Sequence, residues 1–209
     1  MSNDSTIGIV KEFANKDPRI RYLSEKDHGI YDAFNKGWKI AKGEWIYYLG
    51  SDDVLTEDGI GKLMNEAEIA GMDVGCINGG VLRISQDGYR RKVMSNGYIG
   101  SHQGMIMRRT AIEELNGFDL KYKILADYNL FIRMKNSHWS VINTDTIVAY
   151  FKAGGTSEKI SSTHLVFKEK LMILRSDKYC NFPILITLYD TSRTVLGGIF
   201  HRCVSKIKV

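Results

Sequence analysis

The sequence predicts an α/β fold, a three-layer sandwich in which helices cover both faces of a mainly parallel sheet. Helical and strand-like patterns alternate over the first half of the chain. The strand-like run Trp45–Leu49 is apolar without alternation, as expected of a strand that is buried on both faces. With 209 residues, 44% of them hydrophobic, and only two prolines, the chain is long enough to bury a substantial core.

The elements of the first half follow from helical spacing and from capping residues. The predicted elements are a helix after Asp4, a strand over 19–24, a helix over 29–43, a strand over 45–49 and a helix capped by Thr56 that ends at Gly71. Strands that alternate with helices in this way are typical of parallel sheets, in which ligands bind at the carboxyl ends of the strands.

The second half has a more mixed pattern. The predicted elements are a hairpin around Gln86-Asp87-Gly88, a strand over 102–107, a short helix from Thr110 to Gly117, a helix from Ala126, strands over 140–143 and 146–151, a loop over 152–159, a helix over 163–175 and a last helix from Pro183. Asp190 and Arg193 interrupt the last apolar run, so we expect no transmembrane span.

Charge divides the chain into two parts. Residues 160–209 hold eight Lys/Arg and three Asp/Glu and therefore carry the whole net charge of +5. We expect a domain over 1–159 and a basic helical extension over 160–209. A net positive charge confined to a tail argues against nucleic-acid binding. Three widely spaced cysteines and the lack of a signal-like N-terminus favour a cytoplasmic protein.

The stretch "GSDDVL" places Ser51-Asp52-Asp53 between a predicted strand and a predicted helix. Two neighbouring carboxylates offer the hard oxygen ligands that Mg²⁺ or Mn²⁺ prefers, and such an ion neutralises charge on a departing phosphate. The alternative is a plain turn in which both aspartates bind backbone groups ahead of Thr56. Residue types alone leave both interpretations open.

Four blocks, in order, resemble the signatures of bacterial family 2 glycosyltransferases. They are "SEKDHGIYDAFNKGWKIAKGEWIYYLGSDDVL", "SHQGMIMRR", "NGFDLKYKILADYNLFIRM" and "AYFKAGGTS". The resemblance implies the GT-A fold, which is the Rossmann-like fold of nucleotide-diphospho-sugar transferases. It also implies transfer of a sugar from a nucleoside-diphosphate sugar, with a UDP-sugar favoured, in the polysaccharide-biosynthesis subgroup.

The same resemblance assigns roles to three aspartates. Asp53 is expected to bind Mn²⁺ or Mg²⁺, and Asp52 to assist it and approach the nucleotide-sugar. Asp127, in "LADYN", matches the catalytic base that removes a proton from the acceptor hydroxyl, so direct displacement would invert the anomeric centre. The family usually has glutamate before this aspartate, where this chain has Ala126. Asp127 is also well placed to cap its own helix.

His102 and Gln103 are candidates for contact with the acceptor or the metal, although a lone histidine is more often structural. Gly154 and Gly155 begin a candidate flap over the diphosphate, because small residues permit close approach. An ordinary loop is the alternative for this glycine pair.

Asp4, Asp32 and Lys36 complete the candidate nucleotide-sugar site. Asp4 corresponds in the resemblance to an aspartate of the base pocket, and Lys36 could face a phosphate. The alternative for Lys36 is a solvated helix side chain, and Asp32 has the same ambiguity.

The family's domain normally opens with a strand, a helix and a second strand, and this chain begins inside the segment that follows them. We therefore expect the usual N-terminal strand-helix-strand to be missing and the activity of this exact chain to be impaired. Alternative functions are a catalytically impaired fragment or interaction module of the same fold, or a sugar-phosphate nucleotidyltransferase. The acceptor is expected to be a saccharide or a lipid-linked saccharide, and the basic segment suits an anionic membrane surface at the inner face of the cell membrane.

Overall fold

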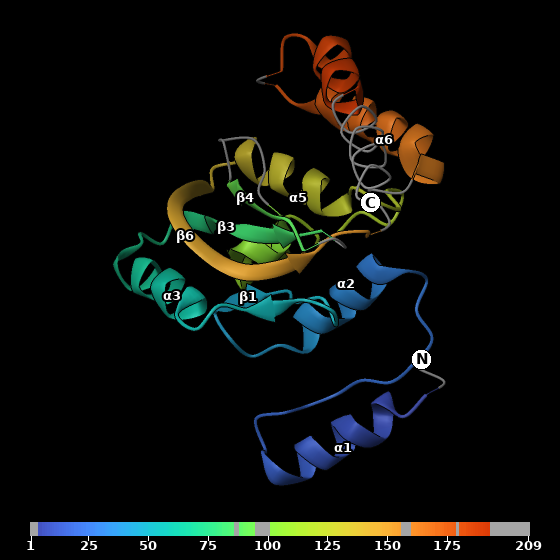
Figure 1. Ribbon diagram of the computed structural model, residues 1–209. Coiled ribbons are helices and arrows are strands. Elements are labelled where there is room, and N and C mark those ends of the chain that lie inside the picture. Colours follow the sequence, from blue (N-terminus) through green and yellow to red (C-terminus); the bar gives the residue numbers. More distant parts are fainter. Residues whose placement is uncertain (1–3, 86–87, 95–100, 156–159, 179, 193–209) are drawn as a thin grey trace.

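Figure 1 shows the computed structural model, which describes residues 4–85, 88–94, 101–155, 160–178 and 180–192. The helices are α1 (Thr6–Lys16), α2 (Ile30–Ile40), α3 (Gly59–Ile69), α4 (Arg109–Glu114), α5 (Ala126–Lys135) and α6 (Thr163–Ser176), with 3-10 turns η1 (His102–Gly104) and η3 (Ile160–Ser162). The strands are β1 (Trp45–Tyr47), β2 (Val54–Leu55), β3 (Val74–Ile84), β4 (Arg90–Met94), β5 (Met105–Arg108) and β6 (Ser140–Lys152). Residues 183–192 are also helical.

The described strands form one six-stranded sheet in the order β1-β5-β3-β6-β2, and β4 pairs with β3 beside this path. β3 and β6 are parallel, whereas the other described pairings are antiparallel. The predicted α/β class is confirmed, and the sheet is mixed rather than mainly parallel. Short connections explain the difference, because the chain turns almost directly from β3 into β4 and a short link permits only antiparallel neighbours.

Helices cover both faces of this sheet, with α3 and α5 on opposite sides (Figure 1). On one face, Leu63 of α3 packs with Ile77 and Ile106. On the other face, Cys76 and Met107 pack with the apolar side chains of α5. Because successive side chains of a strand point to opposite faces, the neighbours Cys76 and Ile77 belong to different layers. This double burial explains why residues 74–81 of β3 are all buried, without alternation.

Helix α6 belongs to the same packed core as α5. Its residues Ile173 and Leu174 are fully buried in the cluster that contains Leu130 and Met134 of α5. Helix α1 differs, because none of its residues is buried. The predicted domain boundary at residue 160 stays a prediction. Within the described part of the chain, no helix is long and apolar enough to cross a membrane.

The structure differs from the predicted secondary structure in three places. Residues 19–24 are exposed and have no regular structure, because no described strand pairs with them. The two strands predicted over 140–151 form the single strand β6. Thr56 does not cap α3, since its hydroxyl donates to the Ile147 carbonyl at 2.7 Å and Asp58 occupies the N-cap. The turn predicted at Gln86-Asp87 lies outside the described residues.

Candidate active site

The acidic turn 51–53 joins β1 to β2, and its two aspartates differ in environment. Asp53 is 8% exposed. Its Oδ2 accepts a hydrogen bond from Gln103 Nε2 at 3.0 Å, and its Oδ1 accepts one from the Lys152 amide at 3.1 Å. Asp52 is exposed. The turn therefore holds one carboxylate in a fixed position and leaves its neighbour facing solvent.

Gly50 provides the space for these two carboxylates. A Cβ at this position would lie 2.5 Å from Asp53 Oδ2 and 3.4 Å from Asp52 Oδ1. The Asp53 amide donates to the Gly50 carbonyl at 3.2 Å, which closes the turn. A residue without a side chain is needed here because the carboxylates fold over its α-carbon.

Asp127 lies in the first turn of α5 and is held by three groups from different parts of the chain. Its Oδ2 lies 3.0 Å from His102 Nδ1. Its Oδ1 accepts from the Tyr31 hydroxyl and from the Tyr128 amide, each at 2.9 Å. The Asp127 side chain is 24% exposed, so these contacts hold the carboxylate while part of the side chain stays accessible to solvent.

The 3-10 turn η1 connects the two aspartates. His102 contacts Asp127, and the next residue, Gln103, contacts Asp53. Gln103 is buried, and its carbonyl accepts a hydrogen bond from the Tyr47 hydroxyl at 2.7 Å. Two acids that lie far apart in the sequence are thus held by adjacent residues.

An aromatic cluster supports this turn from α2 and β1. Phe34 stacks on Tyr48 with ring centroids 4.5 Å apart, and the His102 ring meets Phe34 edge-on at 5.5 Å. Phe118 contacts both Phe34 and Tyr48. Because packed aromatic rings have few alternative positions, this cluster fixes the orientation of the imidazole toward Asp127.

Two opposing effects act on the pKa of Asp127. Burial raises this pKa, because it disfavours the charged carboxylate. The hydrogen bond from His102, the charge of that imidazole when protonated, and the hydrogen bonds from the Tyr128 amide and Tyr31 lower it. The lowering effects prevail, so the pKa lies below the ordinary value of an aspartate and the group is ionised at neutral pH.

Lys36 and Asp32 lie together in a cluster of charges. Lys36 Nζ lies 2.9 Å from Glu25, 3.0 Å from Asp27 and 3.1 Å from Asp32. Hydrogen bonds to Glu25 and then to Asp27 raise the pKa of Lys36 above its ordinary value. Lys36 Nζ also donates to the Lys26 carbonyl at 2.9 Å. Its described contacts are thus with protein oxygens, and its predicted contact with a phosphate stays a prediction.

The remaining predicted site residues are Gly154, Gly155 and Asp4. Gly154 and Gly155 follow the end of β6, two and three residues after Lys152, whose amide binds Asp53. Gly154 has a φ of +107° and both glycines are exposed. Asp4 lies before α1, where its Oδ1 accepts from the Thr6 amide at 3.0 Å. The structure brings Asp53, Asp127, His102 and Gln103 together and gives no described contact between them and Asp4.

Sequence reasoning missed two residues that shape the site. Tyr31 binds Asp127 directly, and Glu169 of α6 accepts three backbone hydrogen bonds just before α5. The buried face of α2 carries Tyr31 and Trp38, whereas the neighbouring Ile30 is 56% exposed. The sequence signal for Tyr31 is therefore its place on the same helix face as Trp38, next to Ile30 in the sequence. No local signal marks Glu169, because its partners are distant in sequence.

The donor atoms of the acidic turn fit a hard divalent cation that also binds a diphosphate. Among the described residues, no three His, Cys, Asp or Glu side chains gather into a cluster that could hold a metal ion. Mg²⁺ commonly binds through one or two carboxylates together with substrate phosphates and water. Each oxygen of Asp53 accepts one described hydrogen bond and keeps a second lone pair. Asp52 and Asp53 thus suit an ion that arrives with its nucleotide.

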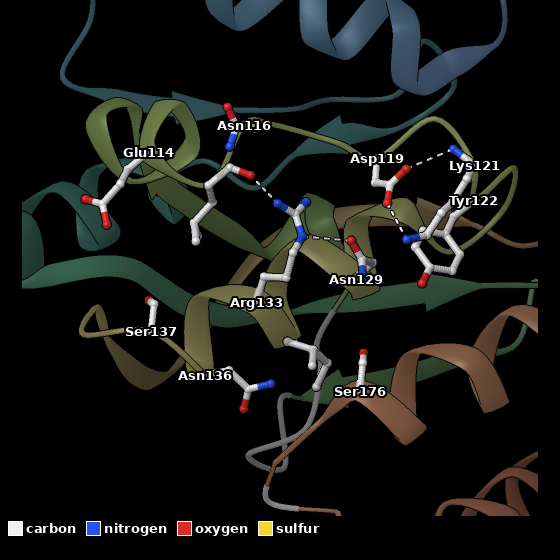
Figure 2. A pocket seen from close by; sticks show the side chains of 12 residues that line it. Glu114, Asn116, Asp119, Lys121, Tyr122, Asn129, Arg133, Asn136, Ser137 and Ser176 are labelled. Atoms are coloured by element: carbon white, nitrogen blue, oxygen red, sulfur yellow. Dashed lines mark hydrogen bonds and ion pairs between the residues drawn. The ribbon is translucent and has the colours of Figure 1, made fainter.

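A separate hollow of about 560 Å³ lies beside α5 (Figure 2). Arg133 crosses it and donates to Asn129 Oδ1 at 2.8 Å and to the Gly117 carbonyl at 2.5 Å. Asp53 and Asp127 are not among the lining residues. Arg133 here binds carbonyl groups after α4, so its contacts explain the loop geometry and point to no ligand.

The family model of "Glycosyl transferase family 2" matches residues 1–135. The chain belongs to this family. It is 28% identical to a PGL/p-HBAD biosynthesis glycosyltransferase of Mycobacterium tuberculosis, over 94% of this chain and 82% of that protein. It is 26% identical to a chondroitin synthase of Escherichia coli, over 64% of this chain and 21% of that protein. The predicted family assignment and transferase class are confirmed.

Solved structures confirm the GT-A fold of this family 2 glycosyltransferase. S. aureus TarS 1-349 in complex with UDP-GlcNAc matches with a TM-score of 0.63 and 16% identity, over 89% of this chain and 58% of that one. The mannosyltransferase PcManGT from Pyrobaculum calidifontis, in complex with GDP-Man and Mn²⁺, matches with a TM-score of 0.60 and 12% identity. The match covers 99% of this chain and 69% of that one. The chain thus spans little more than half of the TarS chain.

Proposed function

We propose that this chain is a metal-dependent, inverting glycosyltransferase. It moves a sugar from a nucleoside-diphosphate sugar to a saccharide or lipid-linked acceptor in the biosynthesis of a bacterial surface polysaccharide or glycolipid. One observation carries the proposal: Asp53 and Asp127 are bound by the adjacent residues Gln103 and His102. A cation site for the leaving diphosphate and a base for the acceptor hydroxyl are required side by side in such a reaction.

Asp53 and Asp52 hold the cation in this proposal, as Mn²⁺ or Mg²⁺. When bound, the ion neutralises the charge that develops on the departing nucleoside diphosphate. Gln103 and the Lys152 amide keep Asp53 in place by donating to its two oxygens. The charged carboxylate needs such donors because it is nearly buried.

Asp127 is the proposed base. Its lowered pKa keeps it ionised, and its partial exposure leaves room for an acceptor hydroxyl. Proton removal makes that oxygen a better nucleophile toward the anomeric carbon, on the side opposite the diphosphate. A single displacement of this kind inverts the anomeric configuration.

The proposed donor is a nucleoside-diphosphate sugar, with a UDP-sugar favoured. TarS is seen with UDP-GlcNAc and PcManGT with GDP-Man and Mn²⁺, and both share the fold of this chain. These neighbours support the class of donor. Gly154 and Gly155 follow Lys152, whose amide binds Asp53, so they are the proposed cover over a diphosphate. Asp4, Asp32 and Lys36 stay candidates for further donor contacts.

A membrane-associated acceptor fits the surface of the C-terminal part. Around the helix at 183–192, five large apolar side chains are exposed: Phe182, Ile184, Leu185, Leu188 and Tyr189. Residues 160–209 also carry the net positive charge of the chain. Exposed apolar side chains in a segment whose sequence is basic suit an anionic bilayer surface, so we include peripheral binding to such a surface in the proposal.

The test is Mn²⁺-dependent turnover of UDP-Glc, UDP-Gal, UDP-GlcNAc and GDP-Man by the full chain. Asp53→Asn is expected to abolish the Mn²⁺-dependent turnover, and Asp127→Asn to lower kcat by about 10²-fold or more. Asp73→Asn is the matched control, because exposed Asp73 lies before β3, outside the described contacts of Asp53 and Asp127, and its contact with Ser140 tolerates an amide. Wild-type activity in either active-site variant would contradict the proposal.

A further inference from the structure

Glu169 is a buried carboxylate on α6 that no step of the proposed reaction uses. It is 3% exposed. Its Oε1 accepts from the Lys123 amide at 2.7 Å, and its Oε2 accepts from the amides of Ile124 at 3.1 Å and Leu125 at 2.9 Å. A buried charge is costly unless donors surround it, and here three consecutive backbone N–H groups do so.

These three amides stand at the entrance to α5. Leu125 is the N-cap residue of this helix, and its own side chain makes no capping hydrogen bond. The first amides of a helix lack partners within the helix, and an anion near them is stabilised by the helix dipole. Glu169 thus binds the N-cap amide of α5 and the two amides before it, and in this sense caps the entry loop of the helix from α6.

The capped loop leads directly to the proposed base. Asp127 follows Leu125 by two residues, in the first turn of α5. The Ile124 carbonyl accepts from the Tyr31 hydroxyl at 2.5 Å, and the same hydroxyl lies 2.9 Å from Asp127 Oδ1. Glu169 and Tyr31 therefore hold the peptide group between Ile124 and Leu125 from its two sides, Glu169 through the Leu125 N–H and Tyr31 through the Ile124 C=O.

We propose that Glu169 is a positioning residue for the glycosyl transfer, which sets the place of Asp127 by fixing the backbone of residues 123–125. This inference rests on the proposed function of Asp127 as the base. Loss of the cap displaces the carboxylate from the line of attack while the donor site at Asp53, which Glu169 does not touch, stays intact. A misplacement of about 1 Å in a reacting group lowers a rate by about 10²-fold.

The test compares Glu169→Gln with two variants of the same helix, Ile173→Val and Ile173→Ala. Glutamine keeps the size of the side chain but replaces one acceptor oxygen by an amide NH2, which cannot accept from the backbone N–H groups. Ile173 is fully buried, so its truncations lower the Tm without changing the acceptors of residues 123–125. Glu169→Asp serves as a second variant, because it keeps the charge and shortens the reach.

Turnover of the best nucleotide sugar of the panel is measured well below every Tm. For Glu169→Gln we expect a kcat lower by about 10-fold to 10²-fold, a donor KM within about two-fold of wild type, and faster hydrogen exchange at Ile124 and Leu125. Glu169→Asp is expected to fall between this variant and wild type. The Ile173 variants are expected to keep kcat within about two-fold over the same range of Tm.

The inference is overturned if kcat of Glu169→Gln follows the Tm in the same way as the Ile173 series, or if exchange at Ile124 and Leu125 is unchanged. Asp127→Asn is measured in parallel. Wild-type turnover by Asp127→Asn would overturn the proposed function itself. A large loss in Asp127→Asn with normal kcat in Glu169→Gln would overturn only the role of Glu169.

Discussion

His102 and Gln103 are neighbours in the chain, and their side chains bind different aspartates. His102 Nδ1 lies 3.0 Å from Asp127, and Gln103 Nε2 lies 3.0 Å from Asp53. A 3-10 turn has three residues per turn, so adjacent side chains diverge by about 120° and can serve separate groups. This turn couples the proposed cation site to the proposed base.

Gln103→Ala is expected to weaken metal binding. The substitution removes the donor to Asp53 Oδ2 and leaves a nearly buried carboxylate less well oriented. Loss of such an outer partner typically costs about 10-fold to 100-fold in metal affinity. The measurement is a Mn²⁺ titration of nucleotide-sugar turnover. An unchanged half-saturation would show that Gln103 does not orient the carboxylate for a cation.

The acidic limb of the pH profile is expected to move in His102→Phe. A base must be ionised, so kcat/KM falls as the pH drops through the pKa of Asp127, which lies below its ordinary value. Phenylalanine keeps the packing on Phe34 but removes a hydrogen bond that lowers this pKa. The pKa therefore rises, and the limb moves to higher pH.

The same lowered pKa makes the free energy of unfolding depend on pH. A lowered folded-state pKa stabilises the protein above the ordinary pKa of aspartate, and this contribution is lost as the pH falls through the folded value.

His138→Phe is the control for the pH profile, because exposed His138 pairs with Glu114 and lies outside the described contacts of Asp127. An equal shift of the limb in both variants would contradict the assignment to Asp127.

Gly50→Ala is expected to disturb the acidic turn. The added Cβ would lie 2.5 Å from Asp53 Oδ2, so a carboxylate must move. We expect a higher Mn²⁺ concentration at half-maximal turnover as a result. Gly61→Ala in α3 is the matched control, since no heavy atom lies within 4 Å of its Cβ and the helix gains about 0.5–1 kcal/mol. Metal titration and thermal melts of both variants check this pair.

Tyr31→Phe and Tyr48→Phe remove hydroxyl groups from the same aromatic cluster with different expected results. The Tyr31 hydroxyl binds Ile124 and Asp127, so its loss costs about 1 kcal/mol of unfolding free energy. The buried Tyr48 hydroxyl has no hydrogen-bond partner among the described residues, so its removal is neutral or stabilising. Urea unfolding measures both, and equal losses would contradict the hydrogen bonding described for Tyr31.

Leu185→Glu is expected to weaken binding to vesicles of phosphatidylcholine and phosphatidylglycerol by about 10-fold to 10²-fold, because burial of a leucine in the bilayer contributes about 1.5–3 kcal/mol. Leu185 is 63% exposed. Met72→Glu, at an 80% exposed site outside the C-terminal segment, is the control. Co-sedimentation with and without phosphatidylglycerol provides the measurement. Equal binding by wild type and both variants would exclude this surface as the contact.

Local sequence was sufficient for several elements. Helix α5 was predicted to begin at Ala126-Asp127, and it does, because its apolar spacing is strong enough to be recognised without partners. The prediction of a strand over residues 19–24 was wrong for the opposite reason. Their short apolar pattern fits a strand, but a strand forms only where another strand offers hydrogen bonds, and none of the described strands does.

Sequence alone determined the α/β class, the acidic turn after β1 and the resemblance that selected Asp53 and Asp127, since these depend on spacing along one stretch of chain. Tertiary structure alone decided which groups hold these acids. Tyr31, Gln103 and Glu169 reach their partners from 96, 50 and 44 to 46 residues away. Contacts over such separations arise from packing of the sheet and helices, and no local pattern of residues encodes them.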